Sequence, residues 1–539
     1  MTFLPRDPQA RLLAWAFVLL APAAFGALAL AFGMDANWDL RNYHYFNGFA
    51  AWHGLYDRHL LASQTPFFYN PALDVPLYLL MEHLPARAVG FILGGLHGLN
   101  AVLMFLIAHG VLRIDGPRRK VAACAALAAF AALGGGHLGI LGTTFHDNIF
   151  SLGALLSLLL VLARRERLAA GPLPWAWMVL AGLPVGIAAG IKQPLAVYAL
   201  GLCLALLLVP GMGWMRRLLN PFFFGIGVLI GIAIGGGPWM VYLWQHYGNP
   251  LFPYFNDVFR SPWGQPKSYR DVGFIPHTWW EWVFFPFTFA FTPYKTGETI
   301  FRELRIPLAF VLIPLAFAAS WWGVRRRGWR LPDVAEPVGA RIVVAMAVIA
   351  YIVWVRLFAI YRYAIPLEIL VALPLVLALA WLPLSRRAWG IASVAMCGAL
   401  LLAMKPGDWQ RVPWADRYVG LTTPVELAEP DRTLVIMGGY APTSFLVPEF
   451  PDGVRFLRPQ SNFTHPEYHN NAFNPLIARL IREHEGPVFA LFQDGDQWHM
   501  SQALGYTDLH MDERDCRRVR GTISDVDVLM CPLLRYPGR

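Results

Sequence analysis

The chain is organised around repeated apolar runs of the length that crosses a lipid bilayer. A spanning α-helix needs about 20 predominantly apolar residues. Uncharged runs of this kind begin at Leu12, Ala88, Val121, Leu168, Gln193, Leu218 and Ile306, and shorter or interrupted runs begin at Ile149, Ile342, Tyr363 and Ala388. With 56% hydrophobic and 15% charged residues, the 539-residue sequence predicts a polytopic α-helical membrane protein with about eleven spans. The Gly- and Pro-rich region 168–215 can be divided in more than one way, so this count is approximate.

Basic residues are distributed asymmetrically between the spans. The clusters lie at 113–120, 164–167, 216–217, 325–330 and 386–387. Threading eleven spans with the N-terminus inside puts every cluster on the cytoplasmic side, as the positive-inside rule requires. The long loops 34–87 and 246–305 and the C-terminal tail then face outward. The net charge of +9 belongs to the membrane part, because residues 405–539 hold 14 Lys+Arg against 18 Asp+Glu, and it gives no support to nucleic-acid binding.

Two domains are expected, a transmembrane domain (1–404) and an extracytoplasmic α/β domain (405–539). Strand-like runs at 433–437, 488–492 and 524–531 alternate with a helical run at 474–484 in the second domain. Cys516 and Cys531 lie near the last of these runs, and a disulfide between them fits an oxidising compartment. The alternative is a pair of buried free thiols. The aromatic segment 277–289 of the second long loop predicts a helix lying at the membrane interface.

The first long loop opens on two acids, Asp35 and Asp39. Asn37 can cap a helix that runs to Gly54 and carries Asp39 in its first turn. An acid there can simply complement the helix dipole. A carboxylate beside aromatic residues such as Tyr43 at a membrane boundary also suits a general base or a metal ligand, so both interpretations stay open.

Another acid, Asp147, follows His146 in the short loop before the span near Ile149. It can share a divalent cation with Asp39, because hard cations take oxygen ligands, or it can cap the helix that starts beside it. The metal sites predicted from the sequence are therefore Asp39 and Asp147, with Mg²⁺ or Mn²⁺ as the cofactor. Whether a metal is needed stays open.

Three cations lie at or near span ends. Lys192 interrupts an apolar pair of spans, and Arg356 and Arg362 flank the outer end of the ninth span. Charges at such depths mark functional sites by default, and the planar fork of Arg suits a phosphate. Lys192 can instead extend to the headgroups, and Arg356 can form a structural pair with Glu368.

Common soluble-enzyme motifs are missing from the sequence. It has no P-loop, no HExxH, no CxxC and no GxSxG elbow, and no GxGxxG opens a helix after a strand. Cytosolic nucleotide chemistry therefore has no support.

The membrane part, residues 1 to 404, resembles the GT-C superfamily of integral-membrane glycosyltransferases. The resemblance rests on the first-loop segment WDLRNYHYFNGFAAWHG, the HDN triplet and the YRYAIPL motif. It is most similar to bacterial members related to the aminoarabinose and protein mannosyl transferases. The resemblance implies a sugar donor on polyprenyl phosphate, used at the outer face of the bacterial cytoplasmic (inner) membrane. The acceptor, whether glycan, lipid or protein, stays unknown.

The resemblance also implies roles for individual residues. Asp39 maps to the catalytic acid of the first loop, Asp147 to the acid of the second outer loop, and Arg362 to the arginine of the basic motif. Lys192 is an added phosphate contact by position. Family members that use a metal show a DxD or a further Glu in a later outer loop, for which Glu281 and Glu298 are loose matches.

The expected reaction is sugar transfer with inversion, with membrane lipid around the donor. The aromatic residues expected to wall the sugar or isoprenoid are Tyr43, Tyr45, Trp52 and Tyr69. The alternatives are a polysaccharide ligase or polymerase, and a transporter of lipid-linked sugars.

Overall fold

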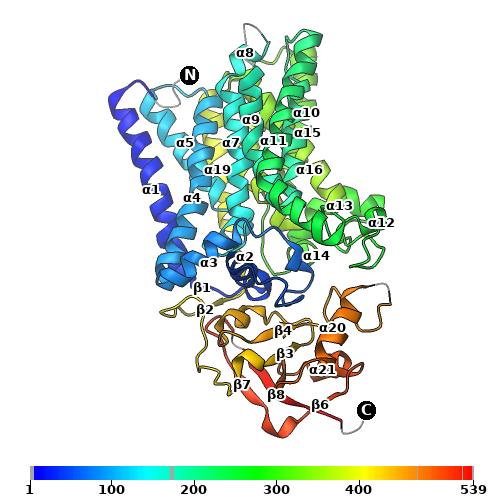
Figure 1. Ribbon diagram of the computed structural model, residues 1–539. Helices are drawn as coiled ribbons and strands as arrows, with labels where there is room; N and C mark the ends of the chain where they lie inside the picture. Colours follow the sequence, from blue (N-terminus) through cyan, green and yellow to red (C-terminus); the bar gives the residue numbers. More distant parts are fainter. Residues whose placement is uncertain (1–4, 170–174, 470, 525, 537–539) are drawn as a thin grey trace.

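A helical bundle and a smaller domain that contains a β-sheet make up the chain, with the first long loop between them (Figure 1). The computed structural model describes residues 5–169, 175–469, 471–524 and 526–536. The N-terminal end of α1 lies at the end of the bundle far from the sheet, and helices α2 and α3 lie at the near end (Figure 1).

Six described helices are long and apolar enough to cross a membrane, so this is a multi-pass membrane protein. They are α1 (Pro8–Phe32), α4 (Ala86–Val111), α11 (Trp214–Tyr247), α15 (Arg305–Arg327), α16 (Pro337–Leu357) and α19 (Arg386–Ala403). A bent pair with an angle of 43° adds a seventh candidate, made of η4 (Tyr361–Ala364) and α17 (Ile365–Leu370) followed by α18 (Ala372–Leu379).

The prediction of about eleven spans is not confirmed by these helices. The other apolar runs form shorter helices within the same bundle: α5 (Pro117–Ala132), α7 (Asp147–Ala163), α9 (Trp175–Ile191) and, after the turn η3 (Gln193–Leu195), α10 (Ala196–Leu207). Each is shorter than the 20 or so residues that a span needs on its own.

The short connecting helices complete the membrane part. They are η1 (Leu40–His44), α2 (Tyr45–His53), η2 (Thr65–Phe68), α3 (Asp74–His83), α6 (Gly135–Gly139), α8 (Arg165–Ala169), α12 (Asn256–Phe259), α13 (Trp279–Phe291) and α14 (Tyr294–Gly297). Helix α13 confirms the helix predicted at 277–289. Thr278 and Glu281 form a capping box at its start, and Trp279 and Trp280 are exposed.

Helices α9 and α11 pack through two facing rows of glycine. The rows are Gly182, Gly186 and Gly190 on α9, and Gly227, Gly231 and Gly235 on α11. A Cβ atom at any of these positions would collide with backbone atoms of the opposite helix. Small residues at every fourth position allow such a close approach, which is how helices associate in a lipid environment.

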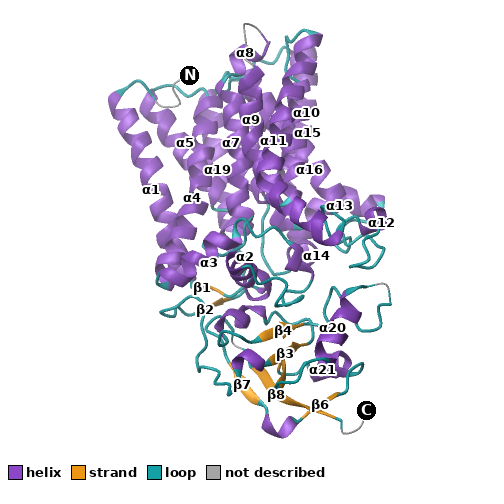
Figure 2. Ribbon diagram, viewed as in Figure 1, coloured by secondary structure: helices purple, strands orange, loops and turns teal. Residues whose placement is uncertain are grey.

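The C-terminal domain is a mixed six-stranded sheet with helices beside it (Figure 2). Its strands are β3 (Leu434–Met437), β4 (Arg455–Leu457), β5 (Val488–Gln493), β6 (Leu509–Met511), β7 (Arg517–Val519) and β8 (Val528–Arg535). The order is β4-β3-β5-β8-β6, with β7 also paired to β8; β3 is parallel to β4 and β5, and β8 is antiparallel to its neighbours. The accompanying helices are η5 (Pro430–Arg432), η6 (Ser444–Glu449), α20 (Phe473–Arg482), α21 (Gln497–Leu504) and η7 (Glu513–Asp515). The predicted strands at 433–437 and 488–492 and the helix at 474–484 are confirmed as β3, β5 and α20. The strand predicted at 524–531 is confirmed only from Val528 onward, as β8, and residue 525 lies outside the described residues.

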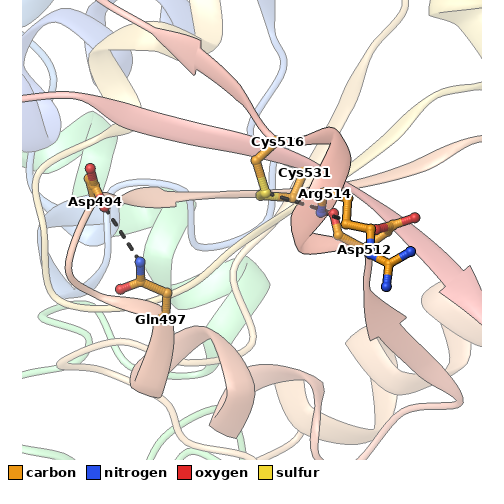
Figure 3. Close-up of a disulfide and its surroundings, with 6 residues drawn as sticks. All are labelled: Asp494, Gln497, Asp512, Arg514, Cys516 and Cys531. Carbon is orange, nitrogen blue, oxygen red and sulfur yellow. Dashed lines mark hydrogen bonds between the residues drawn. A yellow bond between two sulfur atoms is a disulfide. The ribbon is translucent and has the colours of Figure 1, made fainter.

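Cys516 and Cys531 form a disulfide, which confirms the predicted bond (Figure 3). Cys531 lies within β8, and Cys516 lies directly before β7, so the bond ties two neighbouring strands together. Their sequence separation is 15 residues. A bond that closes a loop of this length stabilises a fold by about 3 kcal/mol in the chain-entropy account.

The sheet domain is attached to the first long loop by backbone pairing. Strand β1 (Met34–Asp35) pairs antiparallel with β2 (Arg411–Val412). The backbone N–H of Arg458, just beyond β4, donates to Leu60 O at 3.1 Å. Gln64 Nε2 donates to Tyr440 O at 3.1 Å. The carboxyl ends of β3 and β4 therefore face the first loop and hold it against the bundle.

The glycine rows generate a prediction about stability. Replacing Gly186 by Ala places a methyl group against the α11 backbone near Val228, which has no flexible atoms to move aside. Overpacking of this kind costs about 1–3 kcal/mol, so the melting temperature of the full chain in detergent should fall. The matched control is Gly225→Ala on α11, because a Cβ there meets no atom within 4 Å. Equal melting temperatures for the two variants would contradict the proposed packing.

Candidate functional site

The helix of the first loop begins and ends where its sequence predicts. Asn37 Oδ1 accepts a hydrogen bond from the backbone N–H of Leu40 at 2.8 Å, which caps the start. The helix continues through the wide turn η1 into α2 and stops at Gly54, whose φ of 68° is left-handed. Asp39 lies in its first turn. The predicted cap and end are both confirmed.

Asp35 ties the first loop to the loop before α7. Its Oδ2 accepts hydrogen bonds from the backbone N–H and the hydroxyl of Thr144, each at 2.8 Å. Its Oδ1 accepts from the backbone N–H of Asn37 at 3.0 Å and from Asn37 Nδ2 at 2.8 Å. The side chain is fully buried. Asp35 is therefore a positioning residue that sets the spacing between Asp39 and Asp147.

Arg362 lies at the centre of a cluster of acids. Its Nη1 is 3.1 Å from Asp39 Oδ2 and 3.7 Å from Asp147 Oδ2. Its Nε and Nη2 donate to the two carboxylate oxygens of Glu298 at 3.0 and 3.3 Å. The guanidinium also lies 4.2 Å from the centre of the Phe145 ring. One cation thus joins the first loop, the start of α7 and the end of α14.

Lys192 supplies the second cation. Its Nζ donates to Asp147 Oδ1 at 2.8 Å and lies 5.1 Å from the centre of the Tyr363 ring. The break between α9 and α10 positions it, because Pro194 prevents α9 from continuing. Asp147 is 1% exposed, whereas Lys192 is 19% exposed. The lysine is therefore the accessible member of the pair.

Tyrosines line the side of the cluster next to Asp39. The Tyr43 hydroxyl donates to Asp39 Oδ2 at 3.0 Å. Its ring meets the Tyr69 ring edge to face, with centres 5.4 Å apart. The Tyr254 hydroxyl donates to that of Tyr69 at 2.9 Å. Burial raises the pKa of Tyr43 well above its usual value, so the phenol stays protonated and acts as a donor.

The surroundings of Asp39 act on its pKa in opposite directions. Burial raises the pKa above that of an ordinary aspartate, and the charge of Glu298 adds to the increase. Arg362, Lys192 and the hydrogen bond from Tyr43 lower it. The net effect is a raised pKa, which makes Asp39 a stronger proton acceptor than an exposed carboxylate.

A second buried hydrogen-bond network, around Glu368, holds the residue next to Arg362 in the chain. Glu368 accepts hydrogen bonds from the Tyr361 hydroxyl at 2.7 Å and from the backbone N–H groups of Gly136 and His137 at 3.0 and 2.9 Å. Glu368 thus holds the residue next to Arg362 and the start of α6. It does not pair with Arg356, whose side chain is exposed.

Several residues predicted from the sequence lie outside this cluster. The Tyr45 hydroxyl oxygen lies 2.6 Å from a carboxylate oxygen of Glu82 and 2.7 Å from one of Glu449 in the sheet domain. Trp52, near the end of α2, is 57% exposed. Glu281 caps its own helix α13. In the described structure, Tyr45, Trp52 and Glu281 therefore do not contribute to the cluster around Asp39.

Arg356 also lies elsewhere. It lines an open groove of about 500 Å³ together with Ile275, Pro276, His277 and Trp282. Of the predicted site residues, the structure brings together Asp39, Tyr43, Tyr69, Asp147, Lys192 and Arg362.

The two carboxylates assigned to a metal both contact Arg362. Arg362 Nη1 lies 3.1 Å from Asp39 Oδ2 and 3.7 Å from Asp147 Oδ2, so a cation of the protein already neutralises both carboxylates. The two acids therefore fit a shared Mg²⁺ or Mn²⁺ poorly. Glu298 completes the cluster, and the sequence marked it only as a loose match.

A further group was missed by the sequence reasoning. His44, Asp74 and His146 lie together and are buried. His44 lies in the first-loop segment WDLRNYHYFNGFAAWHG and His146 in the HDN triplet, but no spacing in the sequence links the three residues. Burial lowers the pKa of His146 to about 3, so its ring is neutral.

Comparisons of the chain with protein-family models, with curated proteins and with solved structures gave no match.

The hydrogen bonds of Asp35 generate a prediction about how the site is held. In Asp35→Asn, the new amide cannot accept all the bonds that Thr144 and Asn37 donate. Losing a hydrogen bond to a charged group costs about 1.5–3 kcal/mol, so the melting temperature should fall clearly. Asp57→Asn is the control, because Asp57 lies exposed in the same loop. A melting temperature for Asp35→Asn equal to that of the control would contradict this role.

Proposed function

We propose that the protein is a membrane glycosyltransferase that moves a sugar from a polyprenyl-phosphate donor to an acceptor, with inversion. The observation that carries the proposal is the convergence of Asp39, Asp147, Lys192 and Arg362. Helices α2 and α14, which adjoin this cluster in the chain, lie at the end of the bundle next to the sheet domain (Figure 1). A carboxylate with a raised pKa beside two cations is what such a transfer needs.

The orientation in the membrane follows from the basic clusters. Three of them contact neighbouring loops: Arg113 binds Asp333 at 2.7 Å, Arg386 binds Asp115 at 2.6 Å and Arg165 binds Glu336 at 2.6 Å. Helix α8, which begins at Arg165, lies at the end of the bundle opposite the sheet domain (Figure 1). We place that end in the cytoplasm, as the positive-inside rule expects.

The same threading accounts for eleven passes of the inner membrane. It counts the short helices α5, α7, α9 and α10, the bent pair and the six long helices as spans. The cluster around Arg362, the sheet domain and the exposed tryptophans of α13 then lie at the outer face. A lipid-linked donor reaches that face, whereas cytosolic nucleotide sugars do not.

Asp39 is assigned the role of general base. The oxygen of the acceptor hydroxyl attacks the anomeric carbon while the bond from that carbon to the phosphate oxygen breaks. The hydroxyl proton passes to Asp39, and the leaving group departs as polyprenyl phosphate. The Asp39 side chain is 13% exposed, so this carboxylate combines a raised pKa with access to an acceptor.

Lys192 and Arg362 are assigned the leaving phosphate. An ammonium has three N–H donors, and in the described part of the chain one of those of Lys192 is used, by Asp147. The others remain for phosphate oxygens. Preorganised cations of this kind stabilise charge that develops in the transition state.

Charge balance limits how the donor binds. Three carboxylates, Asp39, Asp147 and Glu298, surround the two cations. A phosphate must therefore displace a carboxylate from Arg362 or be accompanied by further positive charge. Glu298 is the one most easily displaced, since it is 38% exposed.

Two other functions are separable by the products they form. A transporter of lipid-linked sugar would leave the bond to phosphate intact. A polysaccharide ligase or polymerase would use a glycan on diphosphate rather than a monosaccharide on monophosphate. The purified chain in lipid discs is incubated with polyprenyl-phosphate hexoses and pentoses and, separately, with a glycan on polyprenyl diphosphate. Release of polyprenyl phosphate indicates the proposed transferase, release of polyprenyl diphosphate a ligase or polymerase, and intact donors in both incubations a transporter.

Substitutions in the cluster test the mechanism. Asp39→Asn removes the proton acceptor and should lower transfer by about 10²–10⁴-fold. Arg362→Lys keeps the charge but loses the planar fork, and should lower it by about 10²–10³-fold. The readout is sugar transfer and release of polyprenyl phosphate, with Asp57→Asn as the control. If both cluster variants retain normal transfer in correctly folded protein, the mechanism is wrong.

The pH profile offers a separate prediction. The base works when deprotonated, so kcat/KM should fall as the pH drops through the raised pKa of Asp39. The groups facing Asp39 are Glu298, Arg362, Lys192 and Tyr43. Glu298→Gln removes a negative neighbour and should move the acid limb to lower pH. Lys192→Met removes a positive one and should move it to higher pH.

Both substitutions also change the charge available to a phosphate, so the pH at which kcat/KM falls, and not the overall rate, is the quantity to compare. Limbs that stay in place, or that move in the same direction, would contradict the assignment of Asp39.

A further inference from the structure

Three buried side chains from separate segments meet beside the Asp39 cluster. His44 lies in η1, Asp74 begins α3, and His146 precedes α7. His44 Nδ1 is 2.7 Å from Asp74 Oδ1, and His146 Nε2 is 3.3 Å from the same oxygen. The three ligand atoms all lie within 4.8 Å of one another.

The spacing is close to that of a tetrahedral metal site. Zinc binds imidazole nitrogen and carboxylate oxygen at about 2.0–2.2 Å, which puts neighbouring ligand atoms about 3.3–3.5 Å apart. The separation between His146 and Asp74 has this value already. The separation between His44 and Asp74 is that of a hydrogen bond and needs to widen by about 0.6 Å.

Buried polar side chains such as these need a hydrogen-bond partner or a bound ion. Their exposures are 3% for His44, 1% for Asp74 and 6% for His146. In the described part of the chain, His146 Nε2 makes no hydrogen bond, although it lies 3.3 Å from Asp74 Oδ1. An unsatisfied buried polar atom costs about 1–3 kcal/mol, and a metal ion bound to this nitrogen would remove that cost.

We propose that His44, Asp74 and His146 bind one Zn²⁺ ion, with a fourth position left for water or another ligand. Two imidazoles and one carboxylate suit zinc, whereas Mg²⁺ prefers oxygen ligands throughout. The site is distinct from the pair of acids Asp39 and Asp147, which contact Arg362. It does not depend on the proposed sugar transfer.

The ion would lie next to the cluster that contains Asp39. The Tyr43 and His44 rings have centres 4.1 Å apart, and the Tyr43 hydroxyl donates to Asp39. Zinc would therefore fix the turn that carries both Tyr43 and His44. Its two positive charges would also offset the excess of carboxylate around Arg362 and Lys192.

Metal titration of the full chain in detergent tests the proposal. Protein stripped with a chelator is titrated with Co²⁺, whose ligand-field absorption reports four-coordinate binding, and Zn²⁺ then displaces it. The expected result is one ion per chain, unaffected by an excess of Mg²⁺. His44→Gln with His146→Gln should weaken binding by at least about 100-fold, because even the outer partners of metal ligands contribute about 10–100-fold.

The matched control is His59→Gln. His59 is also buried in the first loop, is 4% exposed and has a ring nitrogen without a hydrogen bond in the described residues. The His59→Gln variant should bind Co²⁺ with the same affinity as the unaltered chain. Equal affinity in the double variant, or binding that depends on Asp39 and Asp147 instead, would overturn the proposal.

A second measurement decides the matter if the double variant does not fold. X-ray absorption at the zinc edge of the unaltered chain should show scattering from two imidazoles. Failure of the unaltered chain to bind Co²⁺ or Zn²⁺ stoichiometrically, or a spectrum with oxygen ligands alone, would overturn the assignment without any variant.

Discussion

The contacts of the Arg362 guanidinium organise the candidate site. A buried charge is tolerated only when it is paired and hydrogen-bonded, and this one, with a side chain 8% exposed, is shared among Asp39, Asp147 and Glu298. These acids come from parts of the chain that are far apart in sequence. Ion pairs with the same guanidinium therefore hold these three segments together.

Two further buried carboxylates hold the frame around this cation. Glu368 fixes Tyr361, the residue before Arg362, against the start of α6. Asp35 joins the first loop to Thr144. The sheet domain covers the first loop from the other side through β1, β2 and the carboxyl ends of β3 and β4. The loop thus lies between the helical bundle and the sheet domain and is hydrogen-bonded on both sides.

The parts predicted from the sequence are those that depend on local patterns. Apolar runs, an Asn37 cap, a Gly54 stop, alternating strands and a pair of cysteines in the tail each have their cause within a few residues. The count of eleven spans is not confirmed, because α5, α7, α9 and α10 are shorter than a span and pack among longer helices.

The site was predictable only residue by residue. Asp39, Asp147, Lys192 and Arg362 each stood out as charges at the ends of apolar runs, but their convergence depends on tertiary packing. Glu298 and Asp74 lie in ordinary loop sequence and gain their importance from partners elsewhere. Tyr45 looked equivalent to Tyr43, yet it reaches Glu82 and the Glu449 of the sheet domain.

The most direct test of the account is an experimental structure of the full chain in lipid discs with polyprenyl phosphate bound. The account predicts a phosphate within about 3 Å of Lys192 Nζ and of an Arg362 nitrogen, the length of a charge-assisted hydrogen bond, with Asp39 beside it. A phosphate bound elsewhere, for example in the groove beside Arg356, with Lys192 and Arg362 still paired to their acids, would contradict it.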